Sequence, residues 1–159
     1  MYTWPNGNRY EGQFANGKFE GRGIYTWANG ERYEGDFVNG EQHGKGVFTW
    51  SDGSCYEGDY DHGKQTGKGI YTQRDGEYYR GDFVDGLPSG RGFFFWADGD
   101  RYEGDFVNGQ LTGKGVFFYK NGERYEGDFV NGCKEGYGTM YYPDGRYDTG
   151  RWHDDNFMG

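Results

Sequence analysis

Residues 33–40 read Tyr-Glu-Gly-Asp-Phe-Val-Asn-Gly, and this phrase recurs along the whole chain. Its first residue returns at a constant step of 23 residues, at Tyr10, Tyr33, Tyr56, Tyr79, Tyr102 and Tyr125. A degenerate seventh copy places Asp-Thr-Gly-Arg-Trp at residues 148–152. A fixed period of this length predicts a repeat array in which each copy forms one small structural unit.

No linker or change of composition interrupts the array, which indicates one continuous domain over residues 1–159. A partial repeat covers residues 1–9 and a degenerate partial repeat covers residues 148–159. Full repeats begin at residues 10, 33, 56, 79, 102 and 125. Because the chain opens and closes inside a repeat, we expect it to be a segment of a longer array.

The composition limits both the core and the partners. Only 33% of residues are hydrophobic but 21% are aromatic, so the core must be built from rings. The net charge of −9 disfavours nucleic acid and a generic anionic membrane, since both need clustered Lys and Arg. The two cysteines, Cys55 and Cys133, occupy different repeat positions and form no disulfide framework. We therefore expect a reduced, cytoplasmic setting.

Each repeat reads as two short strands. Residues 33–38 alternate aromatic or glycine with charged residues, and residues 44–50 continue as Gly-Lys-Gly-Val-Phe-Thr-Trp. Asn-Gly at 39–40 suits a two-residue hairpin turn, whereas the turn at 29–30 needs one extra residue to keep the rings on one face. The sequence predicts an all-β fold: an elongated, open, twisted, solenoid-like antiparallel meander in a single sheet of 23-residue hairpin repeats.

The turn at 39–40 also predicts a register between the two strands of a repeat. Tyr33 should face Gly46, so that a ring covers a bare stretch of backbone. Glu34 should face Lys45 on the other side of the sheet, as an exposed cross-strand ion pair. The glycines are therefore expected to be sockets for rings rather than phosphate-binding loops.

No arrangement of residues indicates catalysis. Glu34 and Asp36 share one face of a strand, but the pair recurs in four copies, which indicates a solvated charged surface. The histidines, His43, His62 and His153, lie far apart in the sequence and predict no histidine metal site. We expect no enzyme activity, no cofactor and no metal.

The aromatic face is the candidate functional surface. Rings that build the sheet itself are expected at Tyr33, Phe37, Tyr56, Tyr102, Phe106, Tyr125 and Phe129. Rings of the second strands are expected to line a groove and bind a partner, namely Trp27, Trp50, Trp96, Tyr119, Tyr25, Phe48, Tyr71, Phe94 and Phe117. Gln73 replaces Trp in one copy and would form a polar notch in this groove.

The period, the Tyr-Glu-Gly-Asp-Phe start, the Asn-Gly turn and the Gly-x-Gly continuation together resemble the MORN repeat (membrane occupation and recognition nexus). The resemblance covers essentially the whole chain. It implies β-hairpin repeats in an open sheet and a role in scaffolding and protein attachment, often at cytoskeletal or membrane-apposed structures. Phosphoinositide binding and fusion to enzyme domains also occur in that family. Only His43 keeps the family's His-Gly before the Gly-x-Gly unit.

These observations lead to one main hypothesis and two alternatives. The main hypothesis is a non-enzymatic interaction scaffold whose aromatic groove holds an extended or helical segment of another protein, in a cytoskeletal or membrane-apposed assembly. The alternatives are a phosphoinositide-binding membrane module and the targeting portion of a larger multidomain enzyme. Unpaired strand edges also predict a homodimer or end-to-end oligomer.

Overall fold

The computed structural model describes residues 1–159, and its ordered backbone consists of strands and turns. All fifteen strands belong to one antiparallel sheet in which they follow the order of the sequence. The predicted all-β meander of 23-residue hairpin repeats is thereby confirmed. The structure holds no helix long and apolar enough to cross a membrane.

The residues group into two compact units. The first unit comprises Met1–Asp75 with Phe83–Gly86, and the second comprises Gly76–Asp82 with Leu87–Gly159. The strands before residue 75 are β1 (Tyr2–Thr3), β2 (Arg9–Ala15), β3 (Lys18–Thr26), β4 (Arg32–Val38), β5 (Glu41–Thr49), β6 (Cys55–Asp61) and β7 (Lys64–Thr72). The remaining strands are β8 (Tyr78–Val84), β9 (Leu87–Phe95), β10 (Arg101–Val107), β11 (Gln110–Phe118), β12 (Arg124–Val130), β13 (Cys133–Tyr141), β14 (Tyr147–His153) and β15 (Asn156–Phe157). One continuous domain over 1–159 stays a prediction.

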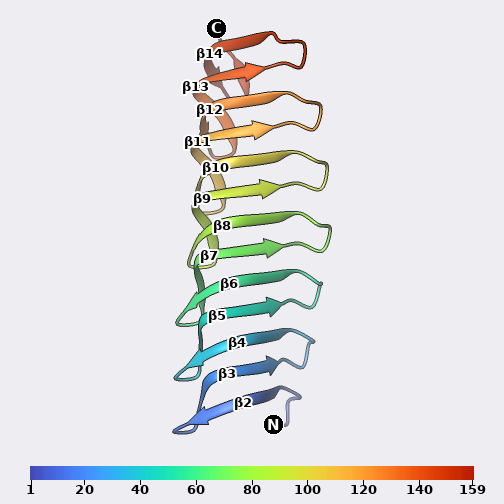
Figure 1. Ribbon diagram of the computed structural model, residues 1–159, viewed down its shortest axis with the longest axis vertical. Coiled ribbons are helices and arrows are strands. Elements are labelled where there is room, and N and C mark those ends of the chain that lie inside the picture. Colours follow the sequence, from blue (N-terminus) through green and yellow to red (C-terminus); the bar gives the residue numbers. More distant parts are fainter. The chain divides into compact units, whose positions relative to one another are not determined.

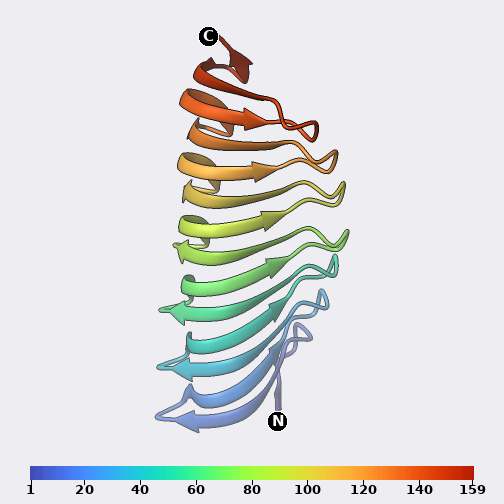
Figure 2. The same ribbon diagram turned by 45° about the horizontal axis from the view of Figure 1, so that its top comes forward.

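Two kinds of turn alternate along each unit, at opposite ends of the strands (Figures 1 and 2). Between β4 and β5, Asn39 and Gly40 both have positive φ, at 51° and 85°, as a tight two-residue hairpin turn requires. Between β3 and β4, the amide of Trp27 donates to the Glu31 carbonyl over 2.9 Å, which closes a three-residue loop. The predicted extra residue in this second turn is therefore confirmed.

A bulge within each repeat changes the register that the sequence predicts. From the tight turn, β4 and β5 pair Phe37 with Gln42, as expected. Beyond the bulge, Gly35 lies opposite Gly46, so the expected pairing of Tyr33 with Gly46 is wrong by two residues. The bulge places three residues of β5 opposite Asp36 alone. Since the shift is an even number, every side chain stays on its predicted face.

The corrected register produces a ladder of glycines. Gly23 faces Gly35 across β3 and β4, and Gly35 faces Gly46 across β4 and β5. A methyl group on Gly58, in the same position of the next repeat, would lie 2.6 Å from the Cα of its partner Gly69. The ladder therefore excludes side chains and lets neighbouring backbones approach closely.

The ring of the repeat's first tyrosine lies over this ladder. A methyl group on Gly69 would lie 2.6 Å from Cε2 of Tyr56, so the glycines are sockets for rings, as predicted. The Tyr56 hydroxyl donates to the Asp59 carbonyl over 2.8 Å at the bulge. The same bond, 2.7 to 3.0 Å long, forms in all six copies.

These tyrosines are the centre of the core. The six tyrosines that begin the repeats are 0% or 1% exposed, and the aromatic residue four positions later is buried in every copy except the first. Tyr102 meets Phe106 and Phe129 edge-to-face, each with ring centroids 5.2 Å apart. Each tyrosine ring thus links its own repeat to the next. Edge-to-face pairs stabilise such contacts by about 0.5–1.5 kcal/mol beyond area burial.

Candidate functional site

The buried tyrosines form a structural layer beneath the candidate site. All seven residues expected to be structural lie in this layer, at Tyr33, Phe37, Tyr56, Tyr102, Phe106, Tyr125 and Phe129, and each is at most 4% exposed. Burial raises the pKa of Tyr102 and Tyr125 to about 12, because a tyrosinate would lose its solvation there. These hydroxyls therefore stay protonated donors and have no role as bases.

The second strands of the first unit bring five of the expected binding residues together in one row. Tyr25 contacts Trp27, and Trp27 contacts Phe48 of the next repeat, with ring centroids 4.5 Å and 5.2 Å apart. Phe48 contacts Trp50, and Trp50 contacts Tyr71, at 4.8 Å and 5.4 Å. All five rings are half-buried, so each packs on its neighbours and still presents an edge to solvent.

The second unit repeats the row with the other four expected binding residues. Phe94 contacts Trp96 at 4.5 Å, Trp96 contacts Phe117 at 5.1 Å, and Phe117 contacts Tyr119 at 4.6 Å. These rings are also half-buried. We call these the aromatic rows, one of Tyr25 to Tyr71 in the first unit and one of Phe94 to Tyr119 in the second.

Hollows adjoin the aromatic row of the first unit. One of about 320 Å³ lies beside Phe48, Trp50 and Tyr60, with Gln42, Gln65 and Lys64 among its other lining residues. Another of about 480 Å³ lies against Trp4, Phe14 and Phe19. Apolar walls with a few polar side chains are the usual lining of a binding pocket.

Two residues, Gln73 and Lys134, alter the polarity around the aromatic rows. Gln73, at the position of Trp27 and Trp50 in its repeat, lines a separate hollow with Asp52, Ser54, Arg74 and Asp75. Lys134 in β13 is only 9% exposed. Its Nζ donates to the Tyr119 hydroxyl over 3.0 Å and lies 5.1 Å from the ring centre of Trp152. Sequence reasoning missed Lys134, although it is the one cation at a position that holds neutral residues in the other copies.

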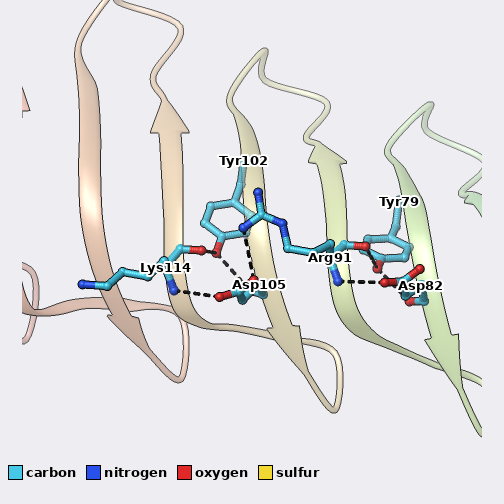
Figure 3. Close-up of polar contacts among 6 residues, drawn as sticks. All are labelled: Tyr79, Asp82, Arg91, Tyr102, Asp105 and Lys114. Carbon is cyan, nitrogen blue, oxygen red and sulfur yellow. Dashed lines mark hydrogen bonds and ion pairs between the residues drawn. The ribbon is translucent and has the colours of Figure 1, made fainter.

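The aspartate in the repeated phrase, such as Asp82 or Asp105, stabilises the bulge through hydrogen bonds (Figure 3). The carboxylate of Asp105 accepts a hydrogen bond of 3.1 Å from the Lys114 amide, and its other oxygen accepts one of 3.2 Å from Arg91 Nη1. Asp82 likewise accepts a bond of 3.0 Å from the Arg91 amide. These carboxylates hold the bulge and bind the preceding repeat.

The expected ion pair of Glu34 with Lys45 is wrong. Lys45 lies opposite Asp59 of the next repeat and pairs with its carboxylate. The hydrogen bond from Lys45 lowers the pKa of the Asp59 carboxyl. Arg22 stands 3.7 Å from Asp36 in the same arrangement. The two-residue register shift explains the error. Because of the shift, Val47 and not Lys45 lies opposite Glu34.

The expectation of a single aromatic face is wrong for the second unit. Its opposite face carries further rings at Tyr78, Phe93, Phe95, Phe118, Tyr141 and Tyr147. Several stack with guanidinium groups: Arg101 Cζ lies 4.7 Å from the Phe118 ring centre, and Arg124 Cζ lies 4.4 Å from that of Tyr141. The first unit holds Thr26, Thr49 and Thr72 at the positions equivalent to Phe95, Phe118 and Tyr141. Comparing the copies position by position would have found this difference.

The histidines are not as separate as their sequence positions suggest. The rings of His43 and His62 lie 5.6 Å apart, and His62 Nδ1 is 3.2 Å from Glu41 Oε2. In the second unit, Glu135, His153 and Asp154 form a group with the spacing of metal ligands. Glu135 Oε1 is 2.8 Å from His153 Nδ1, and Oε2 accepts a 3.0 Å bond from the Asp154 amide. Both carboxylate oxygens are therefore already bound.

Two solved domains of a fly protein have a similar fold. The SAS-4 (dCPAP) TCP domain of Drosophila melanogaster, solved in complex with a proline-rich motif of Ana2 (dSTIL), is 12% identical, with a TM-score of 0.58 over 94% of this chain and 81% of that chain. The TCP10c domain of Drosophila melanogaster Sas-4 is 13% identical, with a TM-score of 0.52 over 92% of this chain and 88% of that chain. At these identities the likeness is one of fold alone.

The family comparison covers almost every repeat. No curated protein sequence matches the chain. The MORN repeat family matches residues 1–9, 10–32, 33–55, 56–78, 79–101, 102–124 and 125–145. The last six of these seven consecutive matches each start at the tyrosine that lies over the glycine ladder, and the first covers the partial repeat at residues 1–9. The chain belongs to the MORN repeat family.

Proposed function

We propose that the protein is a non-enzymatic scaffold that binds an extended or helical segment of another protein on its aromatic rows. The observation that carries the proposal is the half-exposure of the rings in each aromatic row, together with the hollow beside Phe48 and Trp50 in the first unit. Rings that are held rigidly and keep an open edge can take up apolar side chains at low entropic cost. We expect this binding in a cytoplasmic, cytoskeletal or membrane-apposed assembly.

The SAS-4 TCP domain supports the choice of an extended segment. That domain, with a similar strand arrangement, was solved with a proline-rich motif of Ana2 bound to it. Proline-rich segments are already extended, and they dock readily against aromatic surfaces. An open sheet with rings on one face offers this kind of surface in both units of the present chain.

The distribution of charge favours a peptide over a phosphoinositide. The cations of the second strands are paired with aspartates of the following repeat, as Lys45 is with Asp59 and Lys114 with Asp128. Paired cations have little capacity left for phosphate groups. A lipid headgroup would also have to approach a chain with a net charge of −9.

The test is a comparison of captured proteins between three forms of the chain. The double variant Trp50→Ala, Trp96→Ala removes one tryptophan from each aromatic row. The control, Ile70→Ala with Val107→Ala, removes two exposed apolar side chains, 40% and 51% exposed, outside the rows. We expect proteins retained by the wild type and the control to be lost by the double variant, while circular dichroism shows the same β structure. Equal capture by all three forms would contradict the proposal.

A further inference from the structure

A row of alternating rings and guanidinium groups crosses four strands on the opposite face of the second unit. Arg101 of β10 lies opposite Phe95 of β9 and Phe118 of β11. Phe118 in turn lies opposite Arg124 of β12. Tyr102 and Tyr125, the next residues along β10 and β12, point to the buried core. The four residues Phe95, Arg101, Phe118 and Arg124, which we call the arginine–ring row, therefore lie on the face of the second unit away from its aromatic row.

Both guanidinium groups of this row lie over rings. Arg101 Cζ lies 4.7 Å from the centre of the Phe118 ring, and Arg124 Cζ lies 4.4 Å from that of Tyr141. Stacking uses the face of a guanidinium group and leaves the N–H groups at its edge free to donate. Two planar sets of donors are thus fixed in place on an apolar floor.

The row opens into a hollow of about 370 Å³ with a positive lining. Phe95, Arg101, Phe118 and Arg124 form one wall, and the neighbouring turns contribute Lys120 and Glu123. Three cations therefore face one carboxylate. This balance is the reverse of the whole chain, whose net charge is −9.

The cations of the hollow are incompletely paired. Arg101 and Lys120 form no ion pair with any side chain of the protein. Arg124 Nε is buried and has no hydrogen-bond acceptor, although Glu126 Oε1 lies 3.3 Å away. In the first unit, Arg32 occupies the position of Arg101 and is tied to Glu34 at 2.9 Å, beside threonines instead of rings. Arg101 of the second unit thus combines a ring beneath its guanidinium group with the lack of an ion pair, which Arg32 of the first unit does not.

We propose that the arginine–ring row binds an acidic, extended peptide segment of a partner protein. Carboxylates of the peptide would accept hydrogen bonds from the edges of Arg101 and Arg124, and its apolar side chains would lie on Phe95 and Phe118. The four strands of the row span roughly 14 Å, which matches about four residues of extended chain. This site lies on the other face from the aromatic rows, so it stands or falls independently of the function proposed above.

The test uses a defined probe on the full chain. The probe is a short fluorescein-labelled peptide in which Glu alternates with Leu and Pro, and the matched peptide has Gln in place of every Glu. Fluorescence polarisation should show binding of the Glu peptide at low ionic strength, weaker binding as salt is added, and at least about tenfold weaker binding of the Gln peptide. Equal binding of the two peptides, or no binding of either, would overturn the proposal.

Substitutions in the arginine–ring row test whether the Glu peptide binds there. Arg101→Gln with Arg124→Gln should weaken binding of the Glu peptide by about tenfold or more, and Phe118→Thr should weaken it severalfold. Arg32→Gln, the matched change in the first unit, should leave binding unchanged. Arg101→Gln alone, on an exposed and unpaired side chain, keeps the test valid if the double variant folds poorly. Binding of phosphoinositide vesicles through Arg101 without any binding of the Glu peptide would assign the site to lipid and refute the proposal.

Discussion

The two units are alike on one face of the sheet and different on the other. On the core face, Tyr33 of the first unit and Tyr102 of the second are both 0% exposed, and each donates to the equivalent carbonyl at its own bulge, over 2.8 Å and 2.9 Å. On the opposite face, Thr49 of the first unit corresponds to Phe118 of the second. The core face is constrained in every copy, because the tyrosine ring packs on the glycine ladder and its hydroxyl donates to the carbonyl at the bulge. The opposite face is free to vary, so it is where one unit can acquire a function that the other lacks.

The largest expected effect tests the face on which the units agree. A methyl group on Gly58 would lie 2.6 Å from Gly69 Cα, and one on Gly104 would lie 2.5 Å from Gly115 Cα. Gly58→Ala and Gly104→Ala should each lower the free energy of unfolding by about 3 kcal/mol or more, since packed backbone cannot move aside. Urea denaturation followed by tryptophan fluorescence measures the loss.

The control for these variants is Gly132→Ala. Gly132 has a φ of +85° but no atom within 4 Å of an added methyl group, so it should lose only about 1 kcal/mol, from backbone strain. Losses of equal size at Gly58 and Gly132 would show that the ladder is less tightly packed than the structure indicates. A large difference between Gly58 and Gly104 would show that the two core faces are not equivalent.

A smaller effect is expected from the tyrosine hydroxyls. Tyr56→Phe and Tyr102→Phe keep the ring but leave the carbonyls of Asp59 and Asp105 without this donor. Each should lower the free energy of unfolding by about 1–2 kcal/mol, the cost of a buried group left unsatisfied. Tyr147→Phe, at a tyrosine that is 65% exposed, is the control and should have no measurable effect. The two buried variants should agree with each other in the same denaturation experiment.

The face on which the units differ should respond more weakly. Phe118→Thr converts the second unit to the first unit's residue and removes the ring beneath Arg101, at an expected cost of about 1 kcal/mol. The reverse change, Thr49→Phe, should gain only a few tenths of a kcal/mol, because Arg32 is already tied to Glu34. Thermal melts of both variants show whether each change in stability is a loss or a gain. A gain for Thr49→Phe as large as the loss for Phe118→Thr would remove the distinction between the faces.

The sequence was sufficient for the repeat, the strands, both turn types and the side of the sheet on which each ring lies. Alternation decides the face, and a shift of two residues does not change it, so Tyr33 and Phe37 are buried despite the wrong register. The bulge itself could not be read, because it depends on Gly44 at a φ of +68° and on the Asp36 carboxylate that accepts the Lys45 amide. The bond between Asp36 and Lys45 joins two strands, and the pattern of residues within one strand does not reveal it.

The candidate site was less predictable for a related reason. The aromatic rows follow from two residue positions in each repeat, and their members Trp27, Trp50 and Trp96 could be read directly. Lys134 and the phenylalanines of the arginine–ring row differ from the residues at the same position in other copies. A consensus sequence of the repeat conceals such differences. The stacking of Arg101 on Phe118 also requires the true register, which brings residues seventeen apart in sequence opposite each other.

The smallest expected effect concerns a feature at the end of the second unit, where His153 of β14 meets Glu135 of β13. The hydrogen bond and charge of Glu135 raise the pKa of His153 above its usual value near 6.5. A raised pKa in the folded state means that this contact stabilises the fold fully below about pH 6.5 and is lost as the pH rises through the raised value. An NMR titration should give a higher pKa for His153 in the wild type than in Glu135→Gln, with the stability of the two proteins converging at high pH. Identical His153 titrations in both proteins would show that the contact does not persist in solution, and that this end of the second unit is held without it, by the pairing of β13 with β14 and by the bond from Trp152 Nε1 to the Gly138 carbonyl.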